Sequence, residues 1–167
     1  MDVSRKHILV VDDLADAADS TAELLSIWVY DAIACYSGAT ALESACRYRP
    51  DVVLLDLGMP CMDGFQFARL FHELSGCRSI PIIAVSGHFS QACRSNAREA
   101  GILQYLLKPA DPKCLKELLA RTIAAAAILS SLSNDITSHP TVNSPRPKRR
   151  ILHDMSTPQY TTCSTSH

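Results

Sequence analysis

Short apolar runs alternate with helix-length segments five times along this chain of 167 residues. The clearest runs are HILVVDD at 7–13 and DVVLLD at 51–56, which are rich in valine, isoleucine and leucine. Such runs are typical of strands that are buried on both faces of a parallel sheet. Because helical segments separate them, the chain is predicted to form right-handed βαβ units. The expected fold class is α/β, a doubly wound parallel sheet of five strands with five helices.

Cap and turn residues help to set the bounds of these elements. Ser37 and Asp63 are suited to cap the starts of helices, and Gly101 is suited to end one. The expected strands lie near 7–11, 31–35, 51–55, 80–85 and 104–107, and the expected helices lie near 15–28, 38–48, 64–75, 90–100 and 111–130.

Three carboxylates follow two of the apolar runs. Asp12 and Asp13 end the first run, and Asp56 ends the run at 51–56. Ligands of open α/β folds bind at the carboxyl ends of the strands, so these side chains are expected to meet at one edge of the sheet. Carboxylates gathered in one place repel one another unless a cation or protons compensate. Hard oxygen ligands suit Mg²⁺, and the sequence therefore predicts an acidic metal pocket.

Two further strands end in groups that can bind an anion. Ser86 ends the run IPIIAVSG at 80–87, and Lys108 follows the run at 104–107. A lysine ammonium is a common partner of phosphate. A pocket that holds both Mg²⁺ and phosphate is expected to perform phosphoryl transfer, which depends mostly on positioning and charge neutralisation.

Four segments carry a resemblance to a known family: VVDD at 10–13, LLDLGMPCMDG at 54–64, AVSG at 84–87 and YLLKP at 105–109. With these segments the chain resembles the receiver domain of two-component response regulators. The order, spacing and type of the matching residues agree over roughly residues 5–128. The resemblance implies a flavodoxin-like sheet with the strand order 2-1-3-4-5, as in the chemotaxis receiver that illustrates this order.

The resemblance also implies the roles of the acidic residues. Asp56 is implied to be the phosphoacceptor and to contact the metal. Asp13 is implied to bind Mg²⁺ directly, and Asp12 to bind it mainly through water. The carbonyl of Gly58 is implied to complete the protein ligands, and Mn²⁺ is the alternative ion.

Further residues are placed by the same resemblance. Lys108 is implied to pair with the acyl phosphate, and Ser86 to hydrogen-bond it. Ser86 and Tyr105 are implied to form the switch. Gly58 and His88 border the approach of the hydrolytic water in receivers, and they are expected to set the lifetime of the phosphate.

The expected function is that of a phosphoacceptor receiver in a phosphorelay. It would take phosphate from a sensor histidine kinase or a histidine phosphotransfer protein and switch a protein-interaction face. The face of the fourth helix, fifth strand and fifth helix would bind an effector or a second copy. The chain is not expected to be an enzyme beyond catalysing its own Mg²⁺-dependent phosphorylation and dephosphorylation.

Composition changes near residue 130. The receiver domain is expected at 1–130, and the Ser/Thr/Pro-rich segment 131–167, with the basic cluster PRPKRR at 145–150, is expected to be disordered. The net charge is −1, so nucleic-acid or membrane binding by the whole chain is not expected. Seven scattered cysteines without a CxxC pair indicate reduced thiols, and the absence of a signal peptide indicates a cytoplasmic protein.

The sequence leaves two alternative functions open, one of an enzyme and one of a DNA-binding protein. A Mg²⁺-dependent hydrolase of the phosphatase type would usually have an acid/base aspartate two residues after its nucleophile, and here that position is Gly58. A DNA-contacting regulator would use the basic cluster at 145–150, but the segment has too little apolar periodicity to form a helix-turn-helix. The sequence leaves open the cognate kinase and whether the receiver stands alone or belongs to a larger hybrid kinase.

Overall fold

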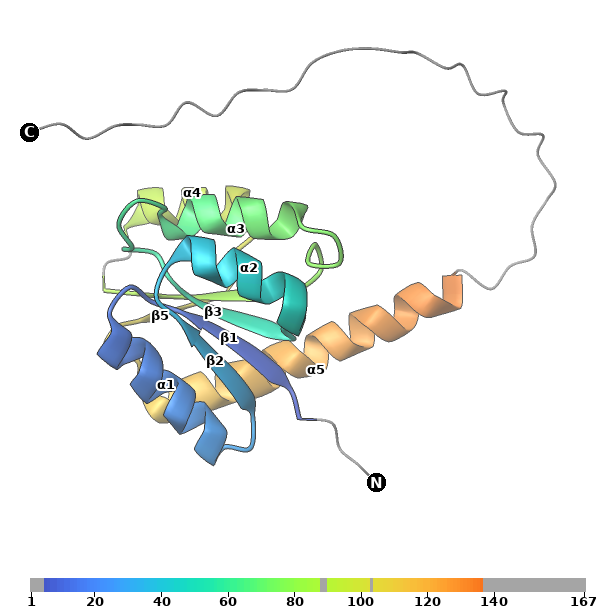
Figure 1. Cartoon of the computed structure of the whole chain (residues 1–167). Coiled ribbons are helices and arrows are strands. Elements are labelled where there is room, and N and C mark those ends of the chain that lie inside the picture. Colours follow the sequence, from blue (N-terminus) through green and yellow to red (C-terminus); the bar gives the residue numbers. More distant parts are fainter. Residues whose placement is uncertain (1–4, 88–89, 103, 137–167) are drawn as a thin grey trace, which may run out of the picture. The chain divides into compact units, whose positions relative to one another are not determined.

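The computed structural model describes residues 5–87, 90–102 and 104–136. Strands and helices alternate throughout, as the sequence predicts (Figure 1). The strands are β1 (His7–Val11), β2 (Asp31–Cys35), β3 (Val52–Asp56), β4 (Ile82–Ser86) and β5 (Gln104–Leu107), and the helices are α1 (Ala15–Ile27), α2 (Gly38–Tyr48), α3 (Gly64–Glu73), α4 (Gln91–Glu99) and α5 (Pro112–Ile136).

The five strands form one parallel sheet with the order β2-β1-β3-β4-β5. This order and the α/β fold class confirm the expectation. The order reverses beside β1, since β2 lies on one side of it and β3 on the other. In open α/β sheets such a switch point is where ligands bind, outside the carboxyl ends of the strands.

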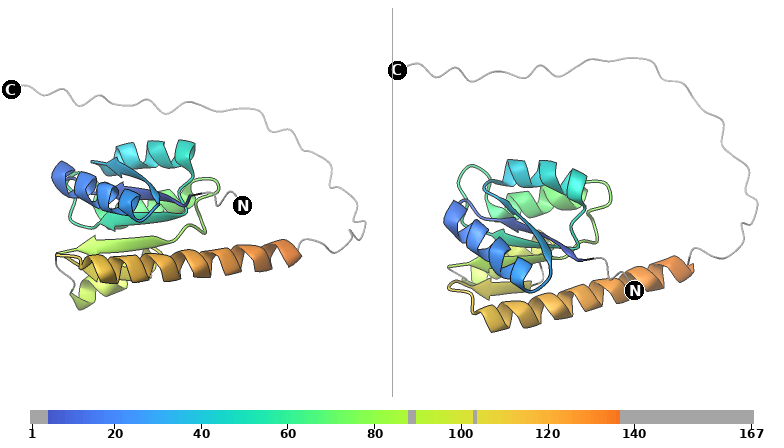
Figure 2. Two further views of the ribbon diagram at one scale, coloured as in Figure 1. Left: turned by 90° about the horizontal axis from the view of Figure 1, so that it is seen from below. Right: turned by 60° about the horizontal axis from the view of Figure 1, so that its bottom comes forward.

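Helices cover both faces of the sheet, and the alternation of side chains along each strand assigns the core to two layers (Figure 2). Leu9 and Leu55 point to the layer of α2, α3 and α4, where Phe67 and Phe71 are fully buried. Alternate strand residues point to the layer of α1 and α5, in which the packed residues include Ile8, Leu54, Leu25, Leu115 and Leu119. The two layers hold the carboxyl ends of β1, β3, β4 and β5 in fixed positions.

Local sequence explains where α2 and α3 begin and where α4 ends. The side chain of Ser37 accepts a hydrogen bond from the backbone of Thr40, and that of Asp63 accepts one from Gln66. These contacts are helix N-caps, as the sequence predicts. Gly101 follows α4 with a φ of 79°, a left-handed conformation that glycine adopts at little cost.

Three features differ from the expectation or lie beyond it. Strands β3 and β4 begin and end slightly later than predicted, so Asp56 and Ser86 are their last residues. Helix α5 continues to Ile136, six residues past the expected end at 130. His88 and the segment 137–167, including the basic cluster at 145–150, lie outside the described residues, and the division at residue 130 stays a prediction. Within the described part of the chain, no helix has both the length and the apolar character needed to cross a membrane.

Candidate functional site

The register of the sheet brings the predicted site residues to one edge. Val11 pairs with Leu55, so the next residues along each strand, Asp12 and Asp56, lie level with each other. Ser86 pairs with Leu107, and Lys108 follows immediately, its backbone N–H donating to the carbonyl of Ser86 over 2.9 Å. Residues that are far apart in sequence thus converge because their strands are parallel neighbours.

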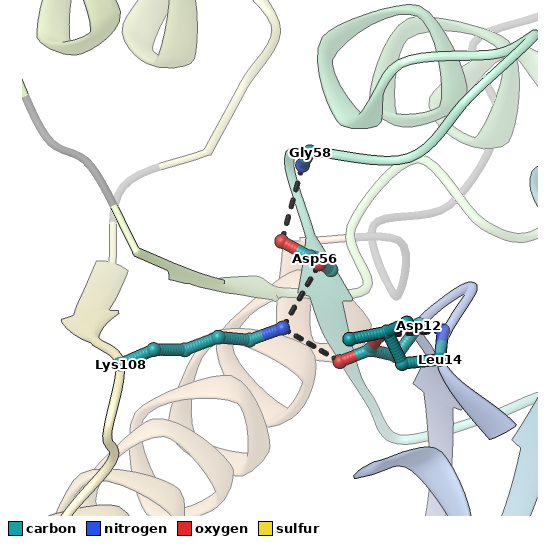
Figure 3. A network of polar contacts seen from close by, with 5 residues as sticks. All are labelled: Asp12, Leu14, Asp56, Gly58 and Lys108. Atoms are coloured by element: carbon teal, nitrogen blue, oxygen red, sulfur yellow. Dashed lines mark hydrogen bonds and ion pairs between the residues drawn. The ribbon is translucent and has the colours of Figure 1, made fainter. Parts of the chain in front are cut away.

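The ammonium of Lys108 bridges two carboxylates (Figure 3). Its Nζ donates to Oδ2 of Asp12 over 2.7 Å and to Oδ2 of Asp56 over 2.9 Å. Burial alone would lower the pKa of Lys108, but the hydrogen bonds and negative charges of the two aspartates together outweigh burial and raise the pKa above its ordinary value. Lys108 is therefore a permanent cation at neutral pH.

Backbone amides fix the other oxygen of each bridged carboxylate. The N–H of Leu14 donates to Oδ1 of Asp12 over 3.0 Å, and the N–H of Gly58 donates to Oδ1 of Asp56 over 3.1 Å. Each carboxylate is thus held by one amide and by the shared ammonium. The Asp56 side chain is nearly buried but keeps 11% of its surface exposed, enough for a reacting group to reach it.

The three carboxylates form a candidate metal site. Asp12, Asp13 and Asp56 each offer an oxygen, and these oxygens lie within 4.8 Å of one another. Lys108 supplies one positive charge to this group of three. Oxygen donors at this spacing fit a hard divalent cation such as Mg²⁺. Asp12, Asp13 and Asp56 are the residues that would hold it.

Two glycines shape the loop after Asp56. A Cβ atom on Gly64 would lie 2.7 Å from the carbonyl oxygen of Asp56 and 2.7 Å from Cα of Leu57, so only glycine fits there. A Cβ atom on Gly58 would lie 3.7 Å from Oδ1 of Asp56, in ordinary contact with the carboxylate. Position 58 therefore faces the carboxylate and is open. The sequence placed Gly64 only at the start of a helix, and its close packing could not be read from the motif.

The predicted switch residues occupy β4 and β5. Ser86 is buried at the end of β4, and Tyr105 is 38% exposed on β5. The guanidinium of Arg94, on α4, lies 5.5 Å from the centroid of the Tyr105 ring, a cation–π contact that the sequence did not predict. Ser86 pairs with the residue before Lys108, so the switch residues are connected to the acidic site through two adjacent strands.

Comparison with known proteins places this geometry in context. Residues 8–120 match the family described as the response regulator receiver domain. The chain is 33% identical over 123 residues to the signal transduction histidine-protein kinase BarA of Shigella flexneri, covering 74% of this chain and 13% of that protein. It is 36% identical over 124 residues to the DNA-binding response regulator MtrA of Mycobacterium bovis, covering 74% of this chain and 52% of that protein. The chain thus spans between about an eighth and a half of these relatives.

Solved structures show the same fold. The chemotaxis protein CheY4 of Vibrio cholerae superimposes with a TM-score of 0.69 and 27% identity, covering 71% of this chain and 99% of that one. The receiver domain of the sensor histidine kinase PA1611 of Pseudomonas aeruginosa superimposes with a TM-score of 0.67 and 30% identity. The match covers 72% of this chain and 99% of that one. That receiver was solved with a magnesium ion coordinated in its active-site cleft.

Proposed function

The chain belongs to the response regulator receiver domain family, and from this premise we propose that Asp56 is the residue that accepts the phosphoryl group. The observation that carries the proposal is the shared ammonium of Lys108, which contacts Asp56 and Asp12 at the carboxyl edge of the sheet. A phosphoacceptor function is shared by response regulators and by the receiver domains of histidine kinases. The proposal assigns that function to a particular carboxylate of this chain.

The proposed step is a displacement at phosphorus. One oxygen of Asp56 forms a bond to phosphorus, the bond from phosphorus to the donor histidine nitrogen breaks, and its electron pair stays on the imidazole. The amide of Gly58 and the ammonium of Lys108 hold the carboxylate in one orientation, which removes the cost of ordering it in the transition state. Lys108 can then pair with an oxygen of the transferred group through a small movement of its flexible side chain.

The divalent cation is part of the proposal. Asp12, Asp13, Asp56 and the carbonyl of Gly58 would hold Mg²⁺, with Mn²⁺ as the alternative. When bound, Mg²⁺ would neutralise negative charge on the phosphoryl oxygens. The fit rests on the three clustered carboxylates, since a single ammonium leaves that cluster with excess negative charge.

The phosphoryl donor is proposed to be a phosphohistidine of a sensor histidine kinase or of a phosphotransfer protein. The relatives include both a histidine-protein kinase and a DNA-binding response regulator. The chain is proposed to act on no substrate other than this phosphoryl donor. A hydrolase would need an acid or base two residues after Asp56, and Gly58, which stands there, has no side chain to serve as one. The hydrolase alternative is therefore not favoured. The DNA-contacting alternative depends on the basic cluster at 145–150, which lies outside the described residues, and the match to the receiver family does not favour it.

The output is proposed to be a change in the face formed by α4, β5 and α5. Phosphorylation adds roughly −1.5 to −2 charge at Asp56. Ser86 would move toward the new group, and Tyr105 would turn into the space that Ser86 leaves. Its contact with Arg94 would then be lost, which changes the surface presented to an effector.

The lifetime of the phosphate is proposed to depend on Gly58 and His88. A Cβ atom at position 58 would lie 3.7 Å from Oδ1 of Asp56, so glycine leaves this side of the carboxylate open to a hydrolytic water. His88 lies outside the described residues, so its part rests on the sequence alone. The change expected for His88→Ala is an altered pH dependence of hydrolysis between roughly pH 6 and 8, where histidine titrates.

The proposed acceptor is tested by phosphorylation with a small acyl phosphate and Mg²⁺. Intact-mass analysis should show one added phosphoryl group on the wild-type chain and none on Asp56→Asn. Asp51→Asn serves as the matched control, because Asp51 is another aspartate next to β3 but pairs with Lys6 instead of Lys108. Equal mass gain in the wild type and Asp56→Asn would reject Asp56. Phosphotransfer profiling of the wild type against histidine kinases would then identify the donor.

A further inference from the structure

The three clustered aspartates are held in different ways. The carboxylates of Asp12 and Asp56 each accept a hydrogen bond from a backbone amide and another from Lys108. Among the residues that the structure describes, none donates a hydrogen bond to the carboxylate of Asp13. The direction of this third carboxylate therefore depends on the backbone that carries it.

The backbone on both sides of Asp13 is anchored. Before it, the N–H of Asp12 donates to the carbonyl of Cys35, the last residue of β2, over 3.1 Å. After it, the N–H of Leu14 donates to Oδ1 of Asp12 (Figure 3), and the carbonyl of Leu14 accepts two hydrogen bonds from the first turn of α1. The position of Asp13 is thus fixed by where β2 ends and by where α1 begins.

The start of α1 has little support from its own sequence. Leu14 occupies the N-cap position, and its side chain offers no oxygen to the free N–H groups of the first turn. Serine, threonine, asparagine or aspartate at this position would supply one, as Ser37 does at the start of α2. A contact from outside the helix therefore contributes more to placing the start of α1 than it would in a capped helix.

One such contact joins α1 to the end of β2. The hydroxyl of Tyr36 donates to Oδ1 of Asp19 over 2.8 Å. Tyr36 directly follows Cys35, and Asp19 lies in the second turn of α1. This hydrogen bond favours the protonated phenol, so it raises the pKa of Tyr36 above its ordinary value. We call the hydrogen bond between Tyr36 and Asp19 the α1–β2 bridge.

We propose that Tyr36 and Asp19 are positioning residues that hold Asp13 in place for the divalent cation. The proposal rests on the metal-binding role proposed above for the three clustered aspartates. The α1–β2 bridge completes a closed cycle of hydrogen bonds and chain segments around Asp13. In order, the cycle passes through Asp12, Cys35, Tyr36, Asp19 and Leu14.

A closed cycle reduces the number of conformations that the segment between β1 and α1 can adopt. Without the bridge, the start of α1 can move relative to the end of β2, and Asp13 moves with it. Binding of a cation then has to order the segment, which weakens the affinity although all three carboxylates remain. Contacts that orient a metal ligand commonly change the affinity in this way. Neither residue of the bridge is one of the three clustered aspartates, so an effect on affinity would act through Asp13.

Isothermal titration calorimetry of the whole chain with magnesium chloride tests the bridge. Tyr36→Phe removes only the hydroxyl and should raise the dissociation constant of Mg²⁺ by at least about threefold, because a hydrogen bond to a charged acceptor is lost. Tyr48→Phe is the matched control and should leave the dissociation constant unchanged. Tyr48 is similarly exposed, at 47% against 49% for Tyr36, but it ends α2 and lies against His7 at the amino end of β1.

Two variants of Asp19 separate the hydrogen bond from the charge. Asp19→Ala and Asp19→Asn both remove the negative charge, but the amide oxygen of asparagine can still accept from Tyr36. Asp19→Asn should therefore bind Mg²⁺ more tightly than Asp19→Ala. The double variant Tyr36→Phe/Asp19→Ala should bind Mg²⁺ no more weakly than Asp19→Ala alone, because both changes break the same hydrogen bond.

The outcomes distinguish this inference from the proposed function. A wild-type chain that does not bind Mg²⁺ overturns both. A weakened Asp13→Ala beside an unchanged Tyr36→Phe overturns the positioning role alone. So does a Tyr36→Phe chain whose midpoint of urea unfolding falls while its affinity for Mg²⁺ does not, since that result shows a purely structural contact. Equal affinities of Asp19→Asn and Asp19→Ala also overturn the role of the hydrogen bond.

Discussion

The ammonium of Lys108 is shared between two carboxylates, and this sharing governs the charge of the acidic site. Three aspartates lie together, but Lys108 can balance only one of their charges. The raised pKa of Lys108 reflects the same imbalance, since the neighbouring carboxylates favour the charged ammonium. At the scale of single residues, the site is therefore preorganised to receive further positive charge, and its response to a divalent cation is the first property to measure.

Replacement of Asp13 by alanine should weaken Mg²⁺ binding by at least about tenfold, because it removes one of three clustered carboxylates. Isothermal titration calorimetry measures the affinity directly. Asp16→Ala provides the control, because Asp16 is a nearby carboxylate in the first turn of α1 but is not one of the three clustered aspartates. An unchanged affinity in Asp13→Ala, or an equal loss in Asp16→Ala, would argue against this metal site.

Substitutions of Gly58 should lengthen the lifetime of the aspartyl phosphate in proportion to their bulk. The Cβ atom would lie 3.7 Å from Oδ1 of Asp56, so a longer side chain can cover the approach of water. Gly58→Ala should have a small effect, Gly58→Met and Gly58→Arg a larger one, and Gly58→Asn should alter the rate through its polar group. The rate of phosphate release from the purified phosphoprotein gives the lifetime. If the rates of the Met and Arg variants equal the wild-type rate, access at position 58 does not control hydrolysis.

At the scale of elements, the connection between β3 and α3 holds the acceptor in place. Helix α3 begins at Gly64, where an added Cβ atom would lie 2.7 Å from backbone atoms of both Asp56 and Leu57. The backbone N–H of Gly64 also donates to the carbonyl of Leu57. The start of the helix is therefore in direct contact with the backbone that carries the acceptor, and a change in the helix start should be transmitted to the site.

Gly64→Ala should destabilise the protein by roughly 1–3 kcal/mol, the usual cost of forcing an extra carbon into a packed region. It should also slow phosphorylation, because the backbone of Asp56 must shift. Gly38→Ala is a closely matched control: Gly38 is likewise the first residue of a helix, but its added carbon would meet the flexible side chain of Met62. Urea unfolding and the phosphorylation rate are the two measurements. Equal stability of the two variants would show that the contact at Gly64 can relax.

The elements could be predicted from sequence because each has a local signal. Apolar runs define the strands, and Ser37, Asp63 and Gly101 mark helix bounds. The end of α5 could not be placed, because an alanine-rich segment favours helix without any stop signal. The sequence was enough to group the site residues, because each one follows the end of a strand. It was not enough to predict which of them contact one another. That Lys108 pairs with Asp12 as well as Asp56 depends on side-chain distances, which only the folded chain determines.

At the scale of the whole molecule, the acidic site and the proposed output face share two strands. Ser86 ends β4 next to the site, and Tyr105 lies on the neighbouring strand with Arg94 against its ring. A second cation–π contact joins α5 to the end of α1, where Nζ of Lys116 is 5.5 Å from the centroid of the Trp28 ring. Trp28 follows the end of α1, whereas the acidic site lies at its beginning. The two contacts can therefore report whether a signal is directed to one face or spread over the molecule.

Binding of a phosphate mimic such as beryllofluoride with Mg²⁺ should shift the NMR resonances of Tyr105 and Arg94 strongly and the indole N–H of Trp28 weakly. The physical reason is that a new charge at Asp56 attracts Ser86. The space that Ser86 leaves is next to β5 and not next to the far end of α1. Chemical-shift mapping of the wild type measures both responses in one spectrum, and Asp56→Asn should show neither. Shifts confined to the residues around Asp12, Asp56 and Lys108 would reject a switch through the face of α4 and β5. Shifts of equal size at Trp28 and Tyr105 would indicate that the fold responds as a whole and that β4 and β5 do not direct the signal.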